Sequence, residues 1–248
     1  KENGGISPTA ISTYLRCQLR FFYHYVGNLI EPEDNDEDMI DNRIFGNIFH
    51  KAAQTLYERL KVLTGNHITS LVIDDLLKSA VEIEQAVDDA FRTELFQISD
   101  PHRKVPAYDG LQLINREVII KYIRQLLETD RKLTPFSILG LELPVKMPLE
   151  WTMVRGYIDR LDKITNPETG EERIRVIDYK TGAKKQKDLP DVAAIFDPAN
   201  VKDHSDYYLQ TFLYSHIVRK NTNLPVSPVL LFIQYAGGEG YDPTLKLG

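Results

Sequence analysis

Two strand-like runs joined by a short turn constrain the fold of this chain most. The runs span residues 155–163 and 173–182, and both are rich in β-branched and aromatic residues. Between them, residues 165–170 read Thr-Asn-Pro-Glu-Thr-Gly, a cluster of turn formers. This pattern predicts an antiparallel hairpin at the centre of the fold.

The hairpin brings two carboxylates together. If it is symmetric about Glu168 and Thr169, Asp159 lies directly across from Asp178. Opposed Cβ atoms are about 4.5–5.5 Å apart, which suits carboxylates that share a cation. Lys180 follows Asp178 by two residues, so its ammonium is expected on the same face. These groups predict a metal-dependent hydrolytic site, in which Mg²⁺ or Mn²⁺ activates a water that Lys180 orients.

Two other interpretations of the hairpin remain open. In an exposed hairpin, the acids and the lysine would only form salt bridges on a solvated face. A glycosidase also uses two acids, but it has no particular need for the lysine. Apolar residues on both faces favour central strands, in which charges are paired or bind metal. The acids are expected to share a face with Leu161, Ile174 and Val176, opposite Ile158, Ile164 and Ile177.

The charge distribution allows a nucleic-acid substrate although the net charge is −6. Residues 31–41 hold seven acids and no base, so the rest of the chain carries a net charge of +1. We expect this acidic stretch to be a linker or loop. A basic groove is one interpretation of the cations near the hairpin, and a solvated lysine loop is the other. These cations are Arg173, Arg175, Lys184, Lys185 and Lys187.

Composition and cysteine content indicate a globular protein of the reducing cytoplasm. Hydrophobic residues make up 42% of the chain and charged residues 27%, and no apolar run reaches the length of a membrane span. The lone Cys17 has no partner for an intramolecular disulfide. Because the sequence starts at Lys1 rather than Met, we expect an excised piece of a longer polypeptide without a signal peptide.

Two helices before the hairpin carry candidate functional residues. Ser7-Pro8 predicts a helix start, and the helix should run to about Val26 with Arg16 and Arg20 one turn apart. These arginines suit one phosphate backbone, or they are solvated residues of a core helix. A second helix, residues 43–63, places His50 beside its apolar stripe. His50 is either a structural residue or a metal ligand.

The remaining pattern predicts a helical insertion and an αβββαβ order. Residues 71–98 and 111–132 read as two helices, and 138–145 as the first strand. In that strand, Glu142 is either an outer-sphere acid or a solvent-facing residue. A helix over 206–219 places Gln210 and Tyr214 on one edge, and 228–234 read as the closing strand.

These motifs together resemble the RecB-like branch of the PD-(D/E)xK nuclease superfamily. The hairpin resembles the core of that family, although Ile158 stands where the name-giving proline would be. The resemblance covers nearly the whole chain except residues 71–132. Its motifs are Gly46-Asn47-Ile48-Phe49-His50, Gly156-Tyr157-Ile158-Asp159, Ile177-Asp178-Tyr179-Lys180-Thr181-Gly182, Gln210-Thr211-Phe212-Leu213-Tyr214 and the opening helix with Cys17.

The resemblance implies a restriction-endonuclease-like α/β fold, with a central mixed sheet flanked by helices, in one domain spanning residues 1–248. It implies Lys180 as the catalytic lysine, and Gln210 and Tyr214 as residues that support the site or contact DNA. Arg16, Arg20, Lys184 and Lys185 are the further DNA-contact candidates. The implied ligands of Mg²⁺ or Mn²⁺ are His50, Asp159, Asp178 and the carbonyl of Tyr179.

The resemblance also raises the question of an iron–sulfur cluster. Some relatives bind an iron–sulfur cluster through four cysteines, and Cys17 matches the first of these. A cluster needs four thiolates or substitutes, so we expect none from this chain alone. Either the lineage lacks the cluster, or the other cysteines lie beyond Gly248.

The implied function is that of a metal-dependent DNA exonuclease, the C-terminal nuclease module of an AddB-like helicase–nuclease in double-strand-break repair. Its partners would be DNA and an AddA-like subunit, without a membrane, in a bacterial cytoplasm at the nucleoid. Two alternatives remain: a catalytically inactive DNA-binding or scaffolding module, and a stand-alone CRISPR-associated nuclease.

Overall fold

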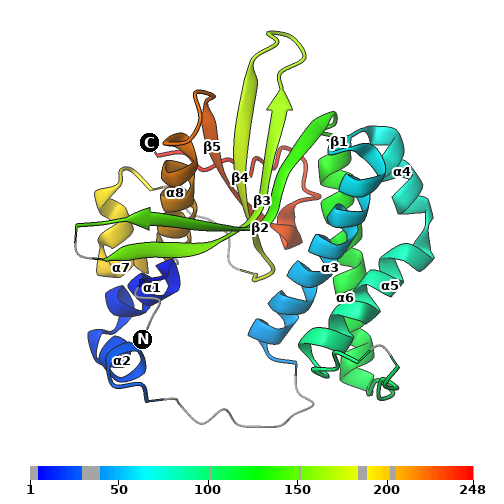
Figure 1. The fold of residues 1–248 in the computed structure, drawn as a ribbon, viewed down its shortest axis with the longest axis horizontal. Coiled ribbons are helices and arrows are strands. Elements are labelled where there is room, and N and C mark those ends of the chain that lie inside the picture. The colour runs from blue at the N-terminus through cyan, green and yellow to red at the C-terminus, as the bar shows by residue number, and fades with distance from the viewer. Residues whose placement is uncertain are drawn as a thin grey trace.

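A mixed five-stranded sheet forms the centre of the molecule (Figure 1). The computed structural model describes residues 5–29, 40–100, 102–150, 152–183, 189–201 and 205–247. The strand order is β1-β2-β3-β4-β5; β5 runs parallel to β4, and the other neighbours are antiparallel. The strands are β1 His67–Ile68, β2 Phe136–Pro148, β3 Met153–Thr165, β4 Glu172–Lys180 and β5 Val226–Phe232.

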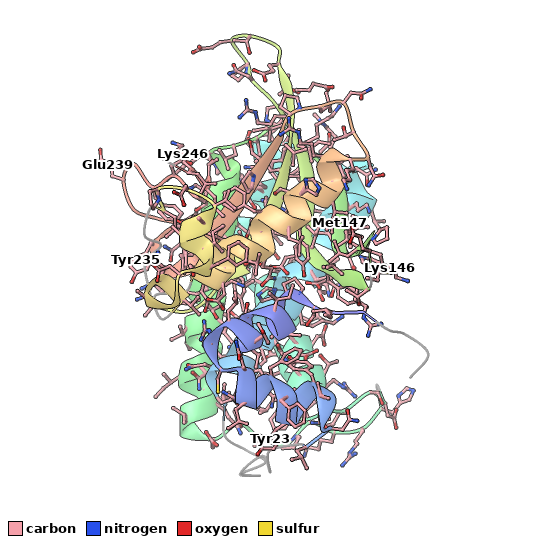
Figure 2. The ribbon with its side chains drawn as sticks, turned by 90° about the vertical axis from the view of Figure 1, so that its left-hand side faces the viewer. Tyr23, Lys146, Met147, Tyr235, Glu239 and Lys246 are labelled. Carbon is pink, nitrogen blue, oxygen red and sulfur yellow. The ribbon has the colours of Figure 1, made fainter. Side chains whose placement is uncertain are left out.

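Helices flank the sheet on both sides. The group α3 to α6 lies at the right in Figure 1, and α1, α2, α7 and α8 lie at the left. In the view of Figure 2, α8 crosses in front of the strands with α1 and α2 below it. The helices are α1 Pro8–Arg16, α2 Gln18–Phe21, α3 Asn42–Thr64, α4 Ser70–Lys78, α5 Ala80–Glu94, α6 Gly110–Arg131, α7 Pro198–Val201 and α8 Ser205–Arg219, with a π-helical turn η1 Phe22–Val26 and 3₁₀ turns η2 Ala193–Phe196 and η3 Ile233–Tyr235.

The element order confirms the expected fold class. The elements α3, β2, β3, β4, α8 and β5 give the αβββαβ order of a restriction-endonuclease-like α/β fold, and α4 to α6 lie between α3 and β2. Within the described part of the chain, no helix combines the length and apolar character needed to cross a bilayer.

The central hairpin has the predicted register. Its ladder runs from the pair Thr165 and Glu172 to the pair Arg160 and Ile177, so Asp159 and Asp178 are the next residues on their strands. In the turn, Asn166 Oδ1 accepts hydrogen bonds from the amides of residues 168 and 169. Gly170 closes the turn with φ of 70°, a left-handed conformation that glycine adopts without strain.

Both faces of the hairpin are buried, as its sequence predicts. One face packs on α3 and α6 through Ile177 and Ile164. The other packs on α8 in a cluster with Leu161, Ile174 and Val176. Ile158 was expected opposite Leu161, but it lies in the same cluster. The register of β2 against β3 shifts between Ile138 and Gly140, and Glu142 on β2 has a left-handed backbone with φ of 43°.

Two helices that were predicted as continuous are interrupted. Ser7 caps the first as expected, but Cys17 adopts an extended conformation and its sulfur accepts from the Arg20 amide. Arg16 therefore ends α1 while Arg20 belongs to α2, so the two arginines do not share a helix face. Residues 71–98 break at Ser79 into α4 and α5, both of which contact α6. The acidic residues 31–39 and Lys184, Lys185 and Lys187 lie outside the described residues.

Candidate active site

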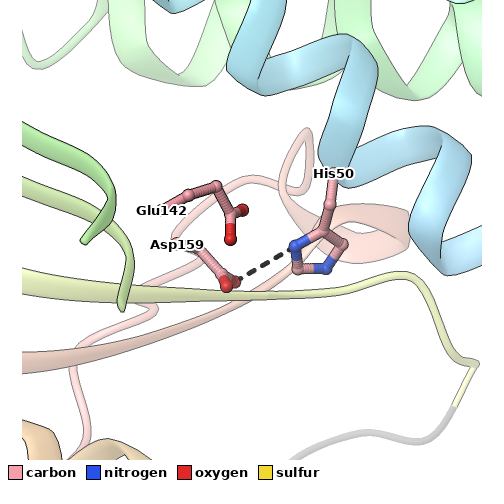
Figure 3. A group of neighbouring side chains, drawn as sticks. All are labelled: His50, Glu142 and Asp159. Carbon is pink, nitrogen blue, oxygen red and sulfur yellow. Dashed lines mark ion pairs between the residues drawn. The ribbon is translucent and has the colours of Figure 1, made fainter. Parts of the chain in front are cut away.

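Three elements bring His50, Asp159 and Asp178 into one region. His50 projects from α3 toward the strand that carries Asp159, and its Nδ1 lies 3.4 Å from Asp159 Oδ2 (Figure 3). The side chain of Asp159 is 11% exposed and that of Asp178 is 5% exposed. A helix and two strands distant in sequence therefore meet at a cluster of almost fully buried carboxylates.

Asp178 is held by two further predicted residues. Lys180 Nζ lies 2.7 Å from Asp178 Oδ2, which fits the prediction that both lie on one face of β4. Gln210 on α8 donates from Nε2 to Asp178 Oδ1 at 2.7 Å. The ring of Tyr207 packs under Lys180, with Nζ 4.6 Å from its centroid. The lysine is thus fixed between a carboxylate and an aromatic face.

The backbone joins the two strands at the site. The amide of Tyr179 donates to Asp159 Oδ2 at 2.7 Å, which fixes the carboxylate of β3 against β4. The ring of Tyr179 lies edge-on to both Phe49 and His50, with centroids 5.9 Å apart in each case. Metal ligation by the Tyr179 carbonyl stays a prediction.

Glu142 belongs to the site, although its sequence context left a solvent-facing role open. On β2, its neighbour Leu141 pairs with Arg160, and its other neighbour Leu143 pairs with Ile158. Glu142 therefore lies across from Asp159. Ligand atoms of His50, Glu142 and Asp159 all lie within 4.8 Å of one another (Figure 3). The signal that would have identified Glu142 is the symmetry of the preceding hairpin: the register set by the pair Pro148 and Met153 places it opposite Asp159.

The electrostatics of the site show an excess of negative charge. Burial alone disfavours the imidazolium of His50, but Asp159 and Asp178 outweigh it and raise the pKa of His50 to about 8. Burial, together with Asp159, raises the pKa of Glu142. Burial also raises the pKa of Asp178. Lys180 lowers this pKa and Asp159 raises it, and the net result is a raised pKa. Three carboxylates thus face two cationic side chains, which favours an additional cation.

The donor set fits a hard divalent cation. Carboxylate oxygens are the preferred ligands of Mg²⁺ and Mn²⁺, and an imidazole completes a mixed site of the kind that Mn²⁺ accepts. His50, Glu142 and Asp159 offer these donors within mutual reach. Lys180, at 2.7 Å from Asp178, supplies a fixed positive charge beside them. Chemically, this arrangement is able to stabilise negative charge that develops on a phosphate.

Protonation of His50 should make metal binding depend on pH. Because a metal ligand must be deprotonated and the pKa of His50 is about 8, ligation of Mn²⁺ by His50 below pH 8 would displace a proton. We expect the Mn²⁺ affinity to rise about tenfold per pH unit from pH 6 to 8 and to level off above. Calorimetry from pH 6 to 9 measures this, with His50→Gln as the control that loses the slope. An affinity that stays constant from pH 6 to 8 would contradict His50 ligation.

Tyr214 lies in the core. It is 4% exposed and belongs to the apolar cluster between the hairpin and α8, and its role in supporting the site or contacting DNA stays a prediction. A Cβ at Gly156 would meet the Tyr214 hydroxyl at 2.0 Å and its Cζ at 2.7 Å. The glycine of the hairpin motif is therefore required because the tyrosine of α8 packs directly on its backbone.

This packing predicts that Gly156→Ala is destabilising. The added methyl has to displace the buried Tyr214 ring, and overpacking of this kind costs about 1–3 kcal/mol. We expect a melting temperature several degrees below that of the wild type in a thermal scan. Gly110→Ala is the matched control, because a Cβ at the first position of α6 meets nothing within 4 Å. Equal losses in both variants would refute the packing argument.

The predicted DNA-contact residues lie in different environments. Arg16 forms an ion pair with Asp206 on α8 at 2.8 Å, so it tethers α1 to α8. Arg20 is exposed on α2. Arg175 is 6% exposed and pairs with Asp162, so it does not line a groove. Its residue type suggested DNA contact, but the strand alternation turns it into the core.

With this geometry established, the comparisons with known proteins define the class. The chain belongs to the PD-(D/E)XK nuclease superfamily, whose model matches residues 5–241. Its curated relatives include proteins named as the B-type subunits of an ATP-dependent helicase/deoxyribonuclease. Those of Carboxydothermus hydrogenoformans and Lactobacillus helveticus are 26% identical, and that of Enterococcus faecalis is 25% identical, each over 72% of this chain. The chain spans 15–16% of the length of these relatives.

Proposed function

We propose that this chain is a DNA nuclease dependent on Mg²⁺ or Mn²⁺ that hydrolyses phosphodiester bonds as an exonuclease. The observation that carries the proposal is the donor cluster of His50, Glu142 and Asp159, lying beside the Asp178–Lys180 pair. Membership of the nuclease superfamily supports it. Residues 1–248 would form one nuclease domain, with 71–132 as its helical insertion.

Each side chain would have a distinct role. His50, Glu142, Asp159 and Asp178 would hold the cation, which supplies Lewis acidity that lowers the pKa of water and withdraws charge from a phosphoryl oxygen. Lys180 would orient the attacking water and neutralise negative charge on the oxygens of the pentacoordinate transition state. Gln210 would hold Asp178 in place, since it already donates to Oδ1.

The relatives suggest the assembly in which such a domain acts. Each is named as one subunit of an ATP-dependent helicase/deoxyribonuclease. By analogy, this chain would be the nuclease module of an AddB-like protein in double-strand-break repair, with an AddA-like partner. Its setting would be the bacterial cytoplasm at the nucleoid. An iron–sulfur cluster is not part of the proposed chemistry.

A cleavage assay tests the proposal. Linear single- and double-stranded DNA are incubated with the protein and Mg²⁺, Mn²⁺ or EDTA, alongside Lys180→Ala shown to be folded by circular dichroism. We expect cleavage that needs the metal and is lost in the variant. A wild type that binds DNA but cuts under none of these conditions, with an AddA-like partner supplied, would establish the inactive scaffolding module instead.

Glu142 provides a separate prediction, because its sequence context leaves both an outer-sphere acid and a solvent-facing residue open. Glu142→Gln keeps the shape of the side chain but removes one negative charge from the cluster. We expect the Mn²⁺ affinity to fall about tenfold, since ligand charge is a main determinant of hard-cation binding. Calorimetry on the folded variant measures this. Glu150→Gln, on the exposed turn after β2, serves as the control with unchanged affinity. An unchanged affinity in Glu142→Gln would exclude Glu142 as a ligand.

A further inference from the structure

A balanced group of charges is buried on the side of the sheet that packs on α3 and α6. Asp130, Arg160 and Asp162 are each at most 1% exposed. Arg160 binds Asp130 through both terminal nitrogens, at 2.5 and 2.8 Å, and its Nε lies 3.2 Å from Asp162. Arg175 makes a bidentate pair with Asp162 at 2.7 and 2.8 Å. Two acids and two bases thus neutralise each other inside the core.

This network joins the helix of His50 to the strand of Asp159. Tyr57 lies on α3 seven residues after His50, and so on the same side of the helix two turns later. Its hydroxyl donates to Asp130, which also accepts from Arg160. Arg160 directly follows Asp159 on β3, and its guanidinium lies 4.8 Å from the centroid of the Tyr57 ring. Three side chains therefore connect two ligand-bearing elements.

The same network extends to the strand of Asp178. Arg175 lies three residues before Asp178 on β4, and its pair with Asp162 fixes β4 against β3. The ring of Tyr179 lies 5.7 Å from the Arg160 guanidinium and 5.9 Å from the His50 ring. Three of the four elements that carry candidate ligands, α3, β3 and β4, are thus bound to one group of buried charges.

Stability is a poor explanation for such a network. Replacing a buried ion pair by apolar residues of similar volume is often neutral or stabilising, because desolvation offsets the attraction. Bidentate hydrogen bonds between buried groups do, however, restrict the geometry of the elements that they join. The arrangement points to a role in orienting the elements rather than in holding the chain folded.

We propose that Tyr57, Asp130 and Arg160 are positioning residues that set the separation of His50 and Asp159, and thereby the affinity of the site for a divalent cation. The effect on cation affinity rests on the proposed function, which assigns a cation to His50 and Asp159. The effect on the separation of these two residues does not depend on it. None of the three side chains needs to touch the cation or the DNA. They act through the spacing of α3 and β3.

A paired substitution separates positioning from stability. Asp130→Leu combined with Arg160→Met removes one acid and one base together, so the pair of Asp162 and Arg175 stays balanced. We expect the double variant of the full chain to melt at or above the wild-type temperature, while its Mn²⁺ affinity by calorimetry falls about tenfold, the scale known for residues that orient metal ligands. Tyr57→Phe, which removes a single hydroxyl, should lower the affinity several-fold.

The chain contains a matched control. Tyr108 donates to Asp88 at 2.9 Å, and Asp88 pairs with Arg116 at 2.6 Å, so the same triad of side chains recurs between α5 and α6 away from the site. Tyr108→Phe should leave the Mn²⁺ affinity unchanged. A folded double variant with wild-type affinity would overturn the proposal. If the double variant does not fold, the comparison of Tyr57→Phe with Tyr108→Phe decides in the same way.

A metal-free measurement keeps this inference distinct from the proposed function. If the wild type binds no Mn²⁺, the metal-dependent function fails, but the spacing of His50 and Asp159 still shows in the ¹⁵N chemical shifts of the His50 ring. Positioning predicts that these shifts change in Tyr57→Phe and stay fixed in Tyr108→Phe. Unchanged shifts in Tyr57→Phe would overturn the proposal whatever the metal result.

Discussion

Asp178→Asn should lower the rate of DNA cleavage at least about 100-fold, the scale on which single electrostatic groups contribute to catalysis. Asparagine keeps the oxygen that accepts from Gln210, but it presents an amide instead of a carboxylate oxygen to Lys180. The variant loses both the negative charge of a proposed ligand and the partner that fixes the lysine. Single-turnover cleavage at saturating Mg²⁺ measures the loss, and KM for DNA should change little.

The stability of the same variant should move in the other direction. Because burial and Asp159 hold the pKa of Asp178 above its usual value, the folded protein disfavours the charged carboxylate. A neutral isostere removes that cost, so metal-free Asp178→Asn should melt at or above the wild-type temperature. Asp242→Asn is the control, because Asp242 pairs with Lys246 at 2.9 Å on the surface. It should cut DNA at the wild-type rate. A folded Asp178→Asn with more than a tenth of wild-type activity would refute the assignment.

Asp130→Ala should cost about 3–5 kcal/mol of the free energy of unfolding. Removing one partner of a buried ion pair leaves the other charge without compensation, and this is far costlier than removing both. Arg160 is 1% exposed, and after the substitution it shares Asp162 with Arg175. Urea unfolding monitored by circular dichroism gives the free-energy difference.

The matched control for this loss is Asp88→Ala. Asp88 accepts from Tyr108 and Arg116 just as Asp130 accepts from Tyr57 and Arg160, but its side chain is 41% exposed. Water replaces the lost partner there, so we expect a change of about 0–1 kcal/mol. Similar losses at the two positions would show that burial of the network does not determine its energetics.

The central hairpin was predictable because its determinants are local. Turn formers fix the connection, and strand alternation fixes the face, so the register follows without knowledge of the rest of the chain. The positions of Asp159 and Asp178, each one residue beyond the ladder that ends at Arg160 and Ile177, and that of Lys180 follow from this register. The order of helices and strands was also predictable, because the spacing of apolar residues along the sequence differs between long helices and strands.

The contacts that complete the site were not predictable in this way. His50 meets Asp159 only because α3 packs on β3, and a lone histidine beside an apolar stripe does not reveal its partner. Glu142 alternates with Leu141 and Leu143 as an exposed residue would, and only the hairpin pairing places it opposite Asp159. Pattern alone supports these residues as candidates, and tertiary packing brings them together.

The burial of charged residues was the feature predicted least well from the sequence. Arg175 was a candidate for lining a basic groove because it lies on the second hairpin strand, close in sequence to Lys184, Lys185 and Lys187, but it is 6% exposed and pairs with Asp162. Asp130 near the end of α6 carries no local signal of burial, since its partner Arg160 is thirty residues away. The arginine spacing in the first helix also misled, because Cys17 divides that helix between Arg16 and Arg20.

The two buried faces of the hairpin have a consequence for hydrogen exchange. Strands β3 and β4 contribute residues to the apolar cluster beneath α3 and α6 and to the one beneath α8. Their amides can reach water only when both clusters open, which approaches complete unfolding. The amide of Tyr179, which holds Asp159, should therefore exchange with deuterium among the slowest in the chain, while the ends of α1 and α2 exchange quickly. Local fluctuations of the surrounding helices would leave Asp159 and Asp178 in place on their strands, while His50 on α3 and Gln210 on α8 would move with their helices.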